Sequence, residues 1–93
     1  MSFDKESATA RATQDLSGRL GVATKGIETI SVKEKDFPDM ALGAPIDDEM
    51  SAQMISSGWE ITLKANGKFF EYRADKYQLR LFNFNGANYI VVS

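Results

Sequence analysis

The chain has 93 residues, which suffice for one compact domain but not for two, so we expect residues 1–93 to form a single domain. Hydrophobic residues make up 43% and charged residues 26%, a composition typical of a folded globular protein. The formal net charge is -2 and the 11 basic residues are scattered along the chain. We therefore expect no nucleic-acid binding, which depends on a clustered basic surface.

Cysteine and histidine are both absent. The chain therefore has no disulfide, no thiolate or imidazole metal ligand, and no imidazole to move a proton near neutral pH. We expect neither a metal nor a cofactor. The first residues lack an apolar signal core, and no segment approaches the roughly 20 apolar residues of a membrane span. These patterns predict a cytoplasmic protein without a membrane span.

The first segment carries apolar residues at every fourth position, which predicts a helix over residues 2–20 with one narrow apolar stripe. The stripe consists of Ala8, Ala12, Leu16 and Leu20. Gly21 suits the left-handed conformation that often ends a helix. The β-branched residues that follow predict a first strand over residues 27–37.

Residues 37–45 contain both prolines of the chain, and proline cannot donate to a sheet ladder, so a loop is predicted here. Residues 50–56 fit either a second strand or a short helix. The loop and the segment after it carry several acidic residues, among them Asp47-Asp48-Glu49, whose spacing does not match an EF-hand calcium loop. We expect these carboxylates to be solvated.

Asn66-Gly67 predicts a type I′ turn, because that turn needs positive φ angles at both central positions. Counting outward from the turn pairs residues 59–65 with residues 68–74. Apolar side chains then lie opposite one another on one face of the hairpin, and Glu60 lies opposite Arg73 on the other. We expect Trp59 to be buried beneath the helix.

Asn85-Gly86 predicts a second hairpin, in which Phe82 pairs with Tyr89 and Leu81 pairs with Ile90. The elements together predict an α+β fold. In this fold the N-terminal helix packs on a mainly antiparallel sheet of four to six strands with consecutive hairpins.

A spaced set of residues between positions 8 and 82 resembles the pattern of a family of small, uncharacterised bacterial proteins, many of them cyanobacterial or secreted. The residues are Asp15-Leu16-Ser17, Arg19-Leu20-Gly21-Val22, Pro38-Asp39, Leu42-Gly43, Pro45, Gln53, Gly58-Trp59, Ile61, Leu63, Gly67, Phe70, Tyr72 and Arg73. The family pattern reads D-L-S-x-R-L-G-V, then W-P-D-x-x-L-G-C-P, then G-[WY]-x-I-x-L followed by Y-x-Y-[HR]. Phe37 and Ala44 stand where it has Trp and Cys. The resemblance implies the fold and brings no established activity.

Serine and threonine are plentiful, but the chain has no histidine to activate them, so we expect no catalytic residues and favour a non-catalytic binding or interaction module. Its partner would be an unidentified protein or a second copy of the chain. Two alternatives are a peptidase-inhibitor-like protein that presents the 37–46 loop and a small carboxylate-dependent enzyme. The enzyme would need a concave pocket with at least two convergent carboxylates.

Two features supply candidate binding residues. The first is the proline-restricted loop, which is either a recognition loop or a rigid crossover whose Leu42 fills the core. The second is a set of aromatic residues on the sheet face that one helix leaves uncovered, unless the loop folds over them. The candidate residues are Asp39, Met40 and Leu42 in the loop and Phe69, Phe82, Phe84 and Tyr89 on the sheet.

Overall fold

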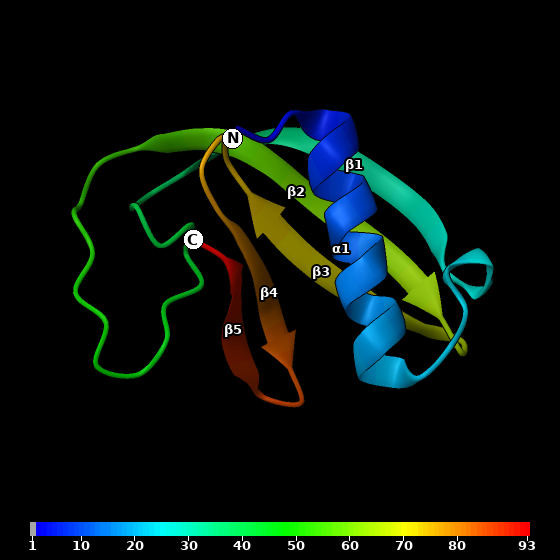
Figure 1. Ribbon diagram of the computed structural model, residues 1–93. Coiled ribbons are helices and arrows are strands. Elements are labelled where there is room, and N and C mark those ends of the chain that lie inside the picture. The colour runs from blue at the N-terminus through cyan, green and yellow to red at the C-terminus, as the bar shows by residue number, and fades with distance from the viewer. Residues whose placement is uncertain (1) are drawn as a thin grey trace.

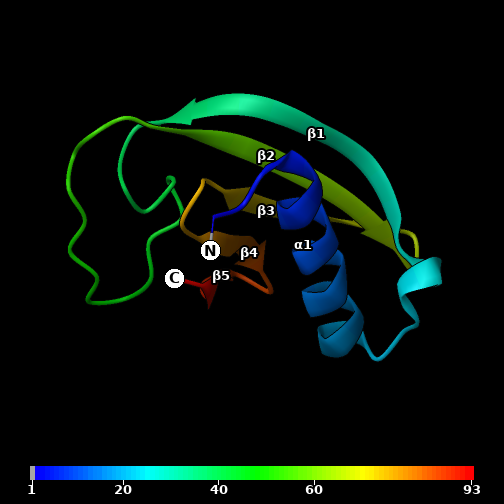
Figure 2. The same ribbon diagram turned by 45° about the horizontal axis from the view of Figure 1, so that its top comes forward.

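Residues 2–93, which the computed structural model describes, form one α-helix packed on a five-stranded antiparallel sheet (Figure 1). The strands lie side by side in chain order. The elements are α1 (Lys5–Leu20), a short 3-10 turn (Thr24–Gly26), β1 (Glu28–Phe37), β2 (Ser56–Ala65), β3 (Lys68–Ala74), β4 (Leu79–Phe84) and β5 (Ala87–Val92). The predicted α+β fold is confirmed. Figure 2 shows β1 and β2 arching over the helix.

The helix α1 begins three residues later than its apolar pattern predicts, because Asp4 is its N-cap. The Asp4 carboxylate accepts a hydrogen bond from the Ser7 backbone N–H, and the Ser7 hydroxyl accepts one from the Asp4 N–H. Gly21 ends the helix as predicted, with φ at +66°. The stripe residues Ala8, Ala12 and Leu16 are fully buried against the sheet.

The central hairpin of β2 and β3 has the predicted register throughout, from Ala65 opposite Lys68 to Trp59 opposite Ala74. Its turn has φ angles of +53° at Asn66 and +74° at Gly67, as the predicted turn type requires. Trp59 lies on the helix face but is half-buried rather than fully covered.

The register predicted for the second hairpin is wrong beyond its turn. The turn itself pairs Phe84 with Ala87, but Leu81 pairs with Tyr89 instead of Ile90. Asn83 causes the shift: its φ is +52°, and its N–H donates to the Asn88 side chain instead of joining the ladder. An extra residue in β4 forms a bulge, and a bulge changes which side chains share a face.

Residues 50–55 form neither the strand nor the short helix that the sequence allows, and β2 begins at Ser56. They belong to a loop, residues 38–55, that joins β1 to β2. Figure 1 shows this loop in green as it leaves the end of β1, passes beside β4 and β5, and returns to the sheet at the start of β2. Its anchorage to β3 and β4 positions the candidate site.

Candidate functional site

Arg73 in β3 fastens the first half of the 38–55 loop to the sheet. One guanidinium nitrogen, Nη1, donates to the carbonyl oxygens of Leu42 and Gly43, both at 3.0 Å. The guanidinium carbon lies 3.8 Å from the centroid of the Phe82 ring, so the two side chains stack. Arg73 pairs across strands with Arg80, on the sheet face opposite α1. The loop therefore covers one end of that face.

Arg80 in β4 fastens the second half of the loop. Its Nη1 donates to the Ala44 carbonyl at 3.1 Å, and the guanidinium makes a two-point contact with the Glu49 carboxylate. Arg80 is 4% exposed. The hydrogen bond from Arg80 holds the pKa of Glu49 below its usual value. Charge-assisted bonds of this kind are about twice as strong as neutral ones, so they hold the loop in one conformation.

Asp39 organises the loop from within. Its carboxylate oxygen Oδ1 accepts hydrogen bonds from the backbone N–H groups of Ala41 and Gly43, both at 3.0 Å. The turn that results places Leu42 and Gly43 in left-handed conformations, at φ +58° and +64°. Leu42 is fully buried. Of the three loop residues predicted to bind a partner, Leu42 therefore fills the core and Asp39 is engaged in a turn.

Met40, the third predicted loop residue, is exposed and belongs to an apolar surface. The surface is formed by Met40, Met54, Ile55 and Tyr77, whose exposed fractions are 37%, 63%, 73% and 72%. We call these four residues the methionine surface. They line a hollow of about 390 Å³ together with Ser56, Ser57, Asp75 and Lys76. The surface combines both ends of the 38–55 loop with the turn between β3 and β4.

Hydrogen bonds fix the three segments that carry the methionine surface. The Met40 carbonyl accepts from the Gln78 side chain at 2.6 Å, and the Met40 N–H donates to the Ala52 carbonyl. Asp75, which is buried, accepts from the Tyr77 N–H at 2.8 Å and from the Ser56 hydroxyl at 2.8 Å. One buried carboxylate thus joins the β3–β4 turn to the start of β2.

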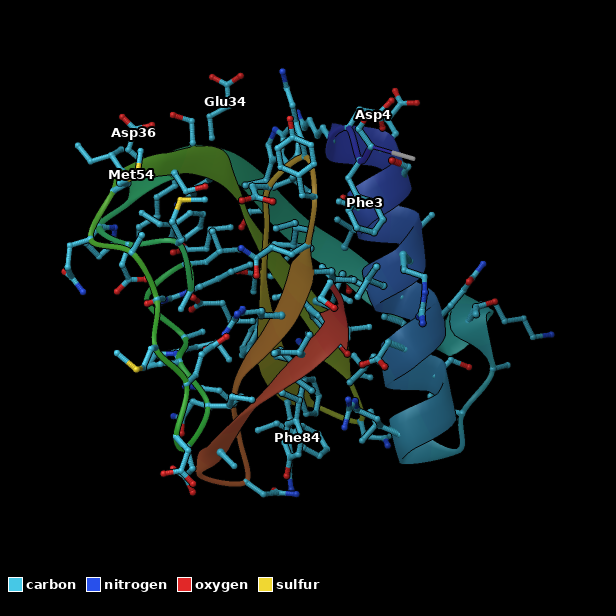
Figure 3. The ribbon with its side chains drawn as sticks, turned by 60° about the vertical axis from the view of Figure 1, so that its left-hand side comes forward. Phe3, Asp4, Glu34, Asp36, Met54 and Phe84 are labelled. Atoms are coloured by element: carbon cyan, nitrogen blue, oxygen red, sulfur yellow. The ribbon has the colours of Figure 1, made fainter. Side chains whose placement is uncertain are left out.

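A second hollow, of about 370 Å³, adjoins the methionine surface. We call it the acidic hollow; its lining residues are Glu34, Lys35, Asp36, Ser57, Gly58, Trp59 and Lys76. Ser57 and Lys76 line both hollows. The Ser57 hydroxyl donates to the Asp36 carboxylate at 2.7 Å. Figure 3 shows Glu34, Asp36 and Met54 projecting outward at the same end of the molecule.

A family model described as a domain of unknown function, DUF8738, matches residues 9–82. The chain belongs to this family. The match extends from α1 into β4 and includes the 38–55 loop and the two arginines that anchor it. No curated protein and no solved structure matched the chain.

In this DUF8738 protein the four predicted aromatic residues do not share one open face. Phe69 and Phe82 lie on the face opposite α1. The bulge at Asn83 turns Phe84 toward α1, where Arg19 lies over Phe84 and Tyr89 at 5.7 and 4.7 Å from the ring centroids. Phe69, Phe82 and Phe84 still line one hollow of about 250 Å³ at the end of the sheet. Phe69 is 64% exposed.

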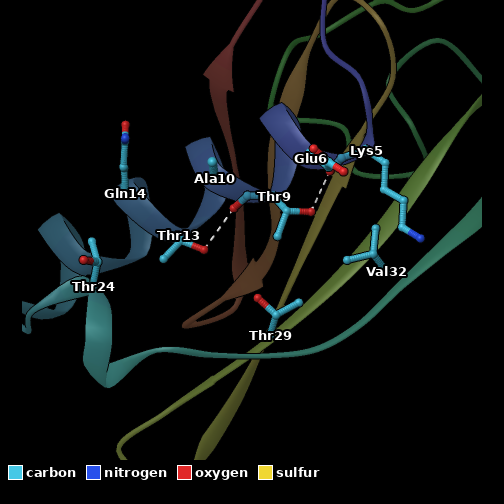
Figure 4. A pocket seen from close by; sticks show the side chains of 9 residues that line it. All are labelled: Lys5, Glu6, Thr9, Ala10, Thr13, Gln14, Thr24, Thr29 and Val32. Carbon is cyan, nitrogen blue, oxygen red and sulfur yellow. Dashed lines mark hydrogen bonds between the residues drawn. The ribbon is translucent and has the colours of Figure 1, made fainter.

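A wider groove, of about 580 Å³, runs between α1 and β1 (Figure 4). The hydroxyl groups of Thr9 and Thr13 line it, but they already donate to the helix carbonyls of Lys5 and Thr9, at 2.7 and 2.9 Å. The hydroxyl protons of these two threonines are therefore not available to a ligand, and the polar groups that the helix adds to the groove are those of Lys5, Glu6 and Gln14.

The acidic hollow brings together two carboxylates, those of Glu34 and Asp36, as the enzyme hypothesis requires. Both side chains are exposed, whereas general acid-base catalysis depends on a pocket that shields one carboxyl from water. Within residues 2–93, no three acidic side chains come together as a potential metal site. None of the helices in the same residues has the length and hydrophobicity needed to cross a membrane.

Of the methionine surface, sequence reasoning found only Met40. Met54 and Ile55 are apolar residues of the segment that fits either a strand or a short helix, and because that choice stayed open, neither residue was assigned to the core or to the surface. Tyr77 carried no signal for this surface. It lies three residues after the end of β3, and it joins the methionine surface only because the 38–55 loop packs beside the β3–β4 turn.

Proposed function

We propose that this DUF8738 protein is a non-catalytic interaction module that binds a partner protein through the methionine surface. The observation that carries the proposal is an exposed group of Met, Ile and Tyr side chains on a loop that two arginines anchor to the sheet. Contiguous exposed apolar side chains are often interaction sites. Methionine suits such a site because its flexible, polarizable side chain adapts to different partners.

The anchorage of the 38–55 loop is a second argument for a binding function. A loop that is already ordered loses little conformational entropy when a partner docks, so more of the contact energy becomes affinity. The carbonyl groups of Leu42, Gly43 and Ala44 are occupied by arginine, and the Leu42 side chain is buried. These contacts disfavour the peptidase-inhibitor hypothesis, since this part of the loop has no free extended backbone to present.

The proposal is tested with the full chain labelled at its methionine methyl groups with ¹³C. The probe is a neutral amphipathic peptide of leucine and glutamine. We expect the peptide to shift the methyl signals of Met40 and Met54. The double substitution Met54→Ser with Ile55→Ser should weaken binding about tenfold or more, because each buried aliphatic side chain contributes roughly 1.5 to 3 kcal/mol.

Phe69→Ser is the matched control, since Phe69 is similarly exposed but lies beside the β2–β3 turn, at the opposite end of β3 from Tyr77. It should leave the affinity unchanged. The proposal fails if no amphipathic peptide shifts the Met40 and Met54 signals, or if Phe69→Ser abolishes binding and Met54→Ser does not. The second result would move the binding site to the aromatic hollow.

A further inference from the structure

We propose that the partner segment recognised by the methionine surface is basic: an amphipathic segment whose apolar residues occupy the methionine surface and whose Lys or Arg enters the acidic hollow. This inference rests on the proposed function and adds the chemistry of the partner. Three observations carry it, namely the charge of the loop region, the composition of the acidic hollow, and the contact between the two hollows.

The 38–55 loop and the strand ends that flank it contain no basic residue. Between positions 36 and 63 the chain has no Lys or Arg, although it has 11 in total. The acidic residues of this region are Asp36, Asp39, Asp47, Asp48, Glu49 and Glu60. Salt bridges join Glu49 to Arg80 and Glu60 to Lys35. Asp36, Asp47 and Asp48 are exposed, so the end of β1 and the loop present unneutralised negative charge to a partner.

The acidic hollow has the groups that bind an organic cation. Glu34 and Asp36 alternate along β1 and lie on the same side as Trp59, since Glu34 pairs directly with Trp59. Carboxylates accept paired hydrogen bonds from a guanidinium, and Trp is the aromatic residue that best attracts a cation to its ring face. A lysine or arginine side chain would meet both kinds of group in this hollow.

Two lysines also line the acidic hollow. The Lys35 ammonium lies 2.8 Å from the Glu60 carboxylate and is held there. Lys76 is exposed and lies between the two hollows. Among residues 2–93, two carboxylates therefore face one ammonium that forms no salt bridge, and the hollow keeps a net negative charge.

The two hollows meet at Ser57 and Lys76. A bound segment that places an apolar side chain against Met54 therefore has a neighbouring side chain within reach of Asp36, and Figure 3 shows these two residues at the same end of the molecule. Apolar contact supplies most of the affinity in this arrangement. Exposed charge pairs contribute less, and they act mainly on specificity and on the rate of association.

The test compares three labelled peptides that share their leucine positions and carry lysine and arginine, glutamine, or glutamate at the polar positions. Affinity for the full chain is measured by fluorescence anisotropy. We expect the basic peptide to bind about tenfold more tightly than the neutral one and the acidic peptide to bind most weakly. The difference should shrink at about 0.5 M salt, where exposed charges are screened.

Variants then show whether the carboxylates of the acidic hollow cause the preference for the basic peptide. Glu34→Gln with Asp36→Asn should remove most of the preference for the basic peptide and leave the affinity for the neutral peptide unchanged. The matched control is Glu6→Gln with Glu28→Gln, which removes two exposed carboxylates elsewhere. The control should keep the preference.

The outcomes separate this inference from the proposed function. If basic and neutral peptides bind equally and both shift Met40 and Met54, the inference is overturned and the interaction module stands. If no peptide shifts those signals, both are overturned. Binding of the basic peptide that survives Met54→Ser with Ile55→Ser also overturns the inference, because that binding would be electrostatic and independent of the methionine surface.

Discussion

Arg80 and Glu49 are 31 residues apart in the chain, yet the guanidinium of one contacts the carboxylate of the other at two points, 2.6 and 2.5 Å. The arginine is nearly inaccessible to water, and the glutamate comes from the 38–55 loop. This ion pair holds the loop against the sheet, and we expect the loop to detach from the sheet when the pair is removed.

Arg80→Met should destabilise the protein by about 2 to 3 kcal/mol, because it removes the guanidinium that donates to both the Glu49 carboxylate and the Ala44 carbonyl. Urea denaturation measures this change. Limited proteolysis should show new cleavage within residues 46–55. Lys68→Met, which changes an exposed lysine beside the β2–β3 turn, is the control. It should neither lower the stability in urea nor create new cleavage sites. Unchanged stability in the Arg80 variant would mean that the ion pair does not anchor the loop.

The pH dependence of stability should report the same ion pair. Arg80 lowers the pKa of Glu49 from its ordinary value of 4.5, so the unfolded state takes up this proton at higher pH than the folded state. The stabilising contribution of Glu49 is therefore present above about pH 5 and is lost as the pH falls through the folded-state pKa. Glu49→Gln removes that contribution. The stability difference between parent and variant should be largest near neutral pH and shrink below pH 4.5; a constant difference would contradict the assignment.

Gly67→Val should lower stability by about 1 to 3 kcal/mol, because it forces a β-branched residue to a positive φ angle. An added Cβ at Gly67 meets nothing within 4 Å, so backbone strain is the cause. Gly26→Val is the control, since Gly26 is equally open and its φ is not positive. Gly43→Val should be worse than Gly67→Val, because a Cβ there lies 2.8 Å from the Arg73 guanidinium as well. Equal urea midpoints for Gly67→Val and the parent would contradict the turn type.

Tyr72→Phe should destabilise the protein by about 1.5 to 3 kcal/mol, the usual cost of losing a hydrogen bond to a charged group. The Tyr72 hydroxyl donates to the Asp15 carboxylate of α1 at 2.8 Å. Burial and this bond raise the pKa of Tyr72 well above its ordinary value of 10.0. The unfolded state loses the proton near pH 10 while the folded state keeps it, so stability falls as the pH rises above 10.

The phenylalanine variant lacks this ionisation, so its stability should fall less between pH 9 and pH 11. Tyr89→Phe is the control, because Tyr89 is partly exposed and has no bond to Asp15. A parallel fall in parent and Tyr72 variant would show that Tyr72 does not link the helix to the sheet.

Local sequence was enough to predict the elements whose geometry depends on neighbouring residues. The helix end at Gly21 and the β2–β3 register follow from backbone preferences at one or two positions, and the apolar pattern of the strands supports the same register. The helix was predicted from residue 2 but begins at Lys5, because Asp4 supplies its N-cap.

The bulge at Asn83 and the site depend on residues that meet only in the folded chain. Asn88, which holds Asn83 out of the ladder, also donates to the Pro45 carbonyl of the loop, so the second hairpin and the loop fix each other. The methionine surface unites segments from positions 40, 54–55 and 77. Arg80 and Glu49 carry no mark of their pairing in a sequence. Side-chain hydrogen bonds between distant segments form only when the folded sheet brings those segments together. Bonds of this kind, from Arg73 and Arg80, fix the path of the 38–55 loop and therefore the methionine surface.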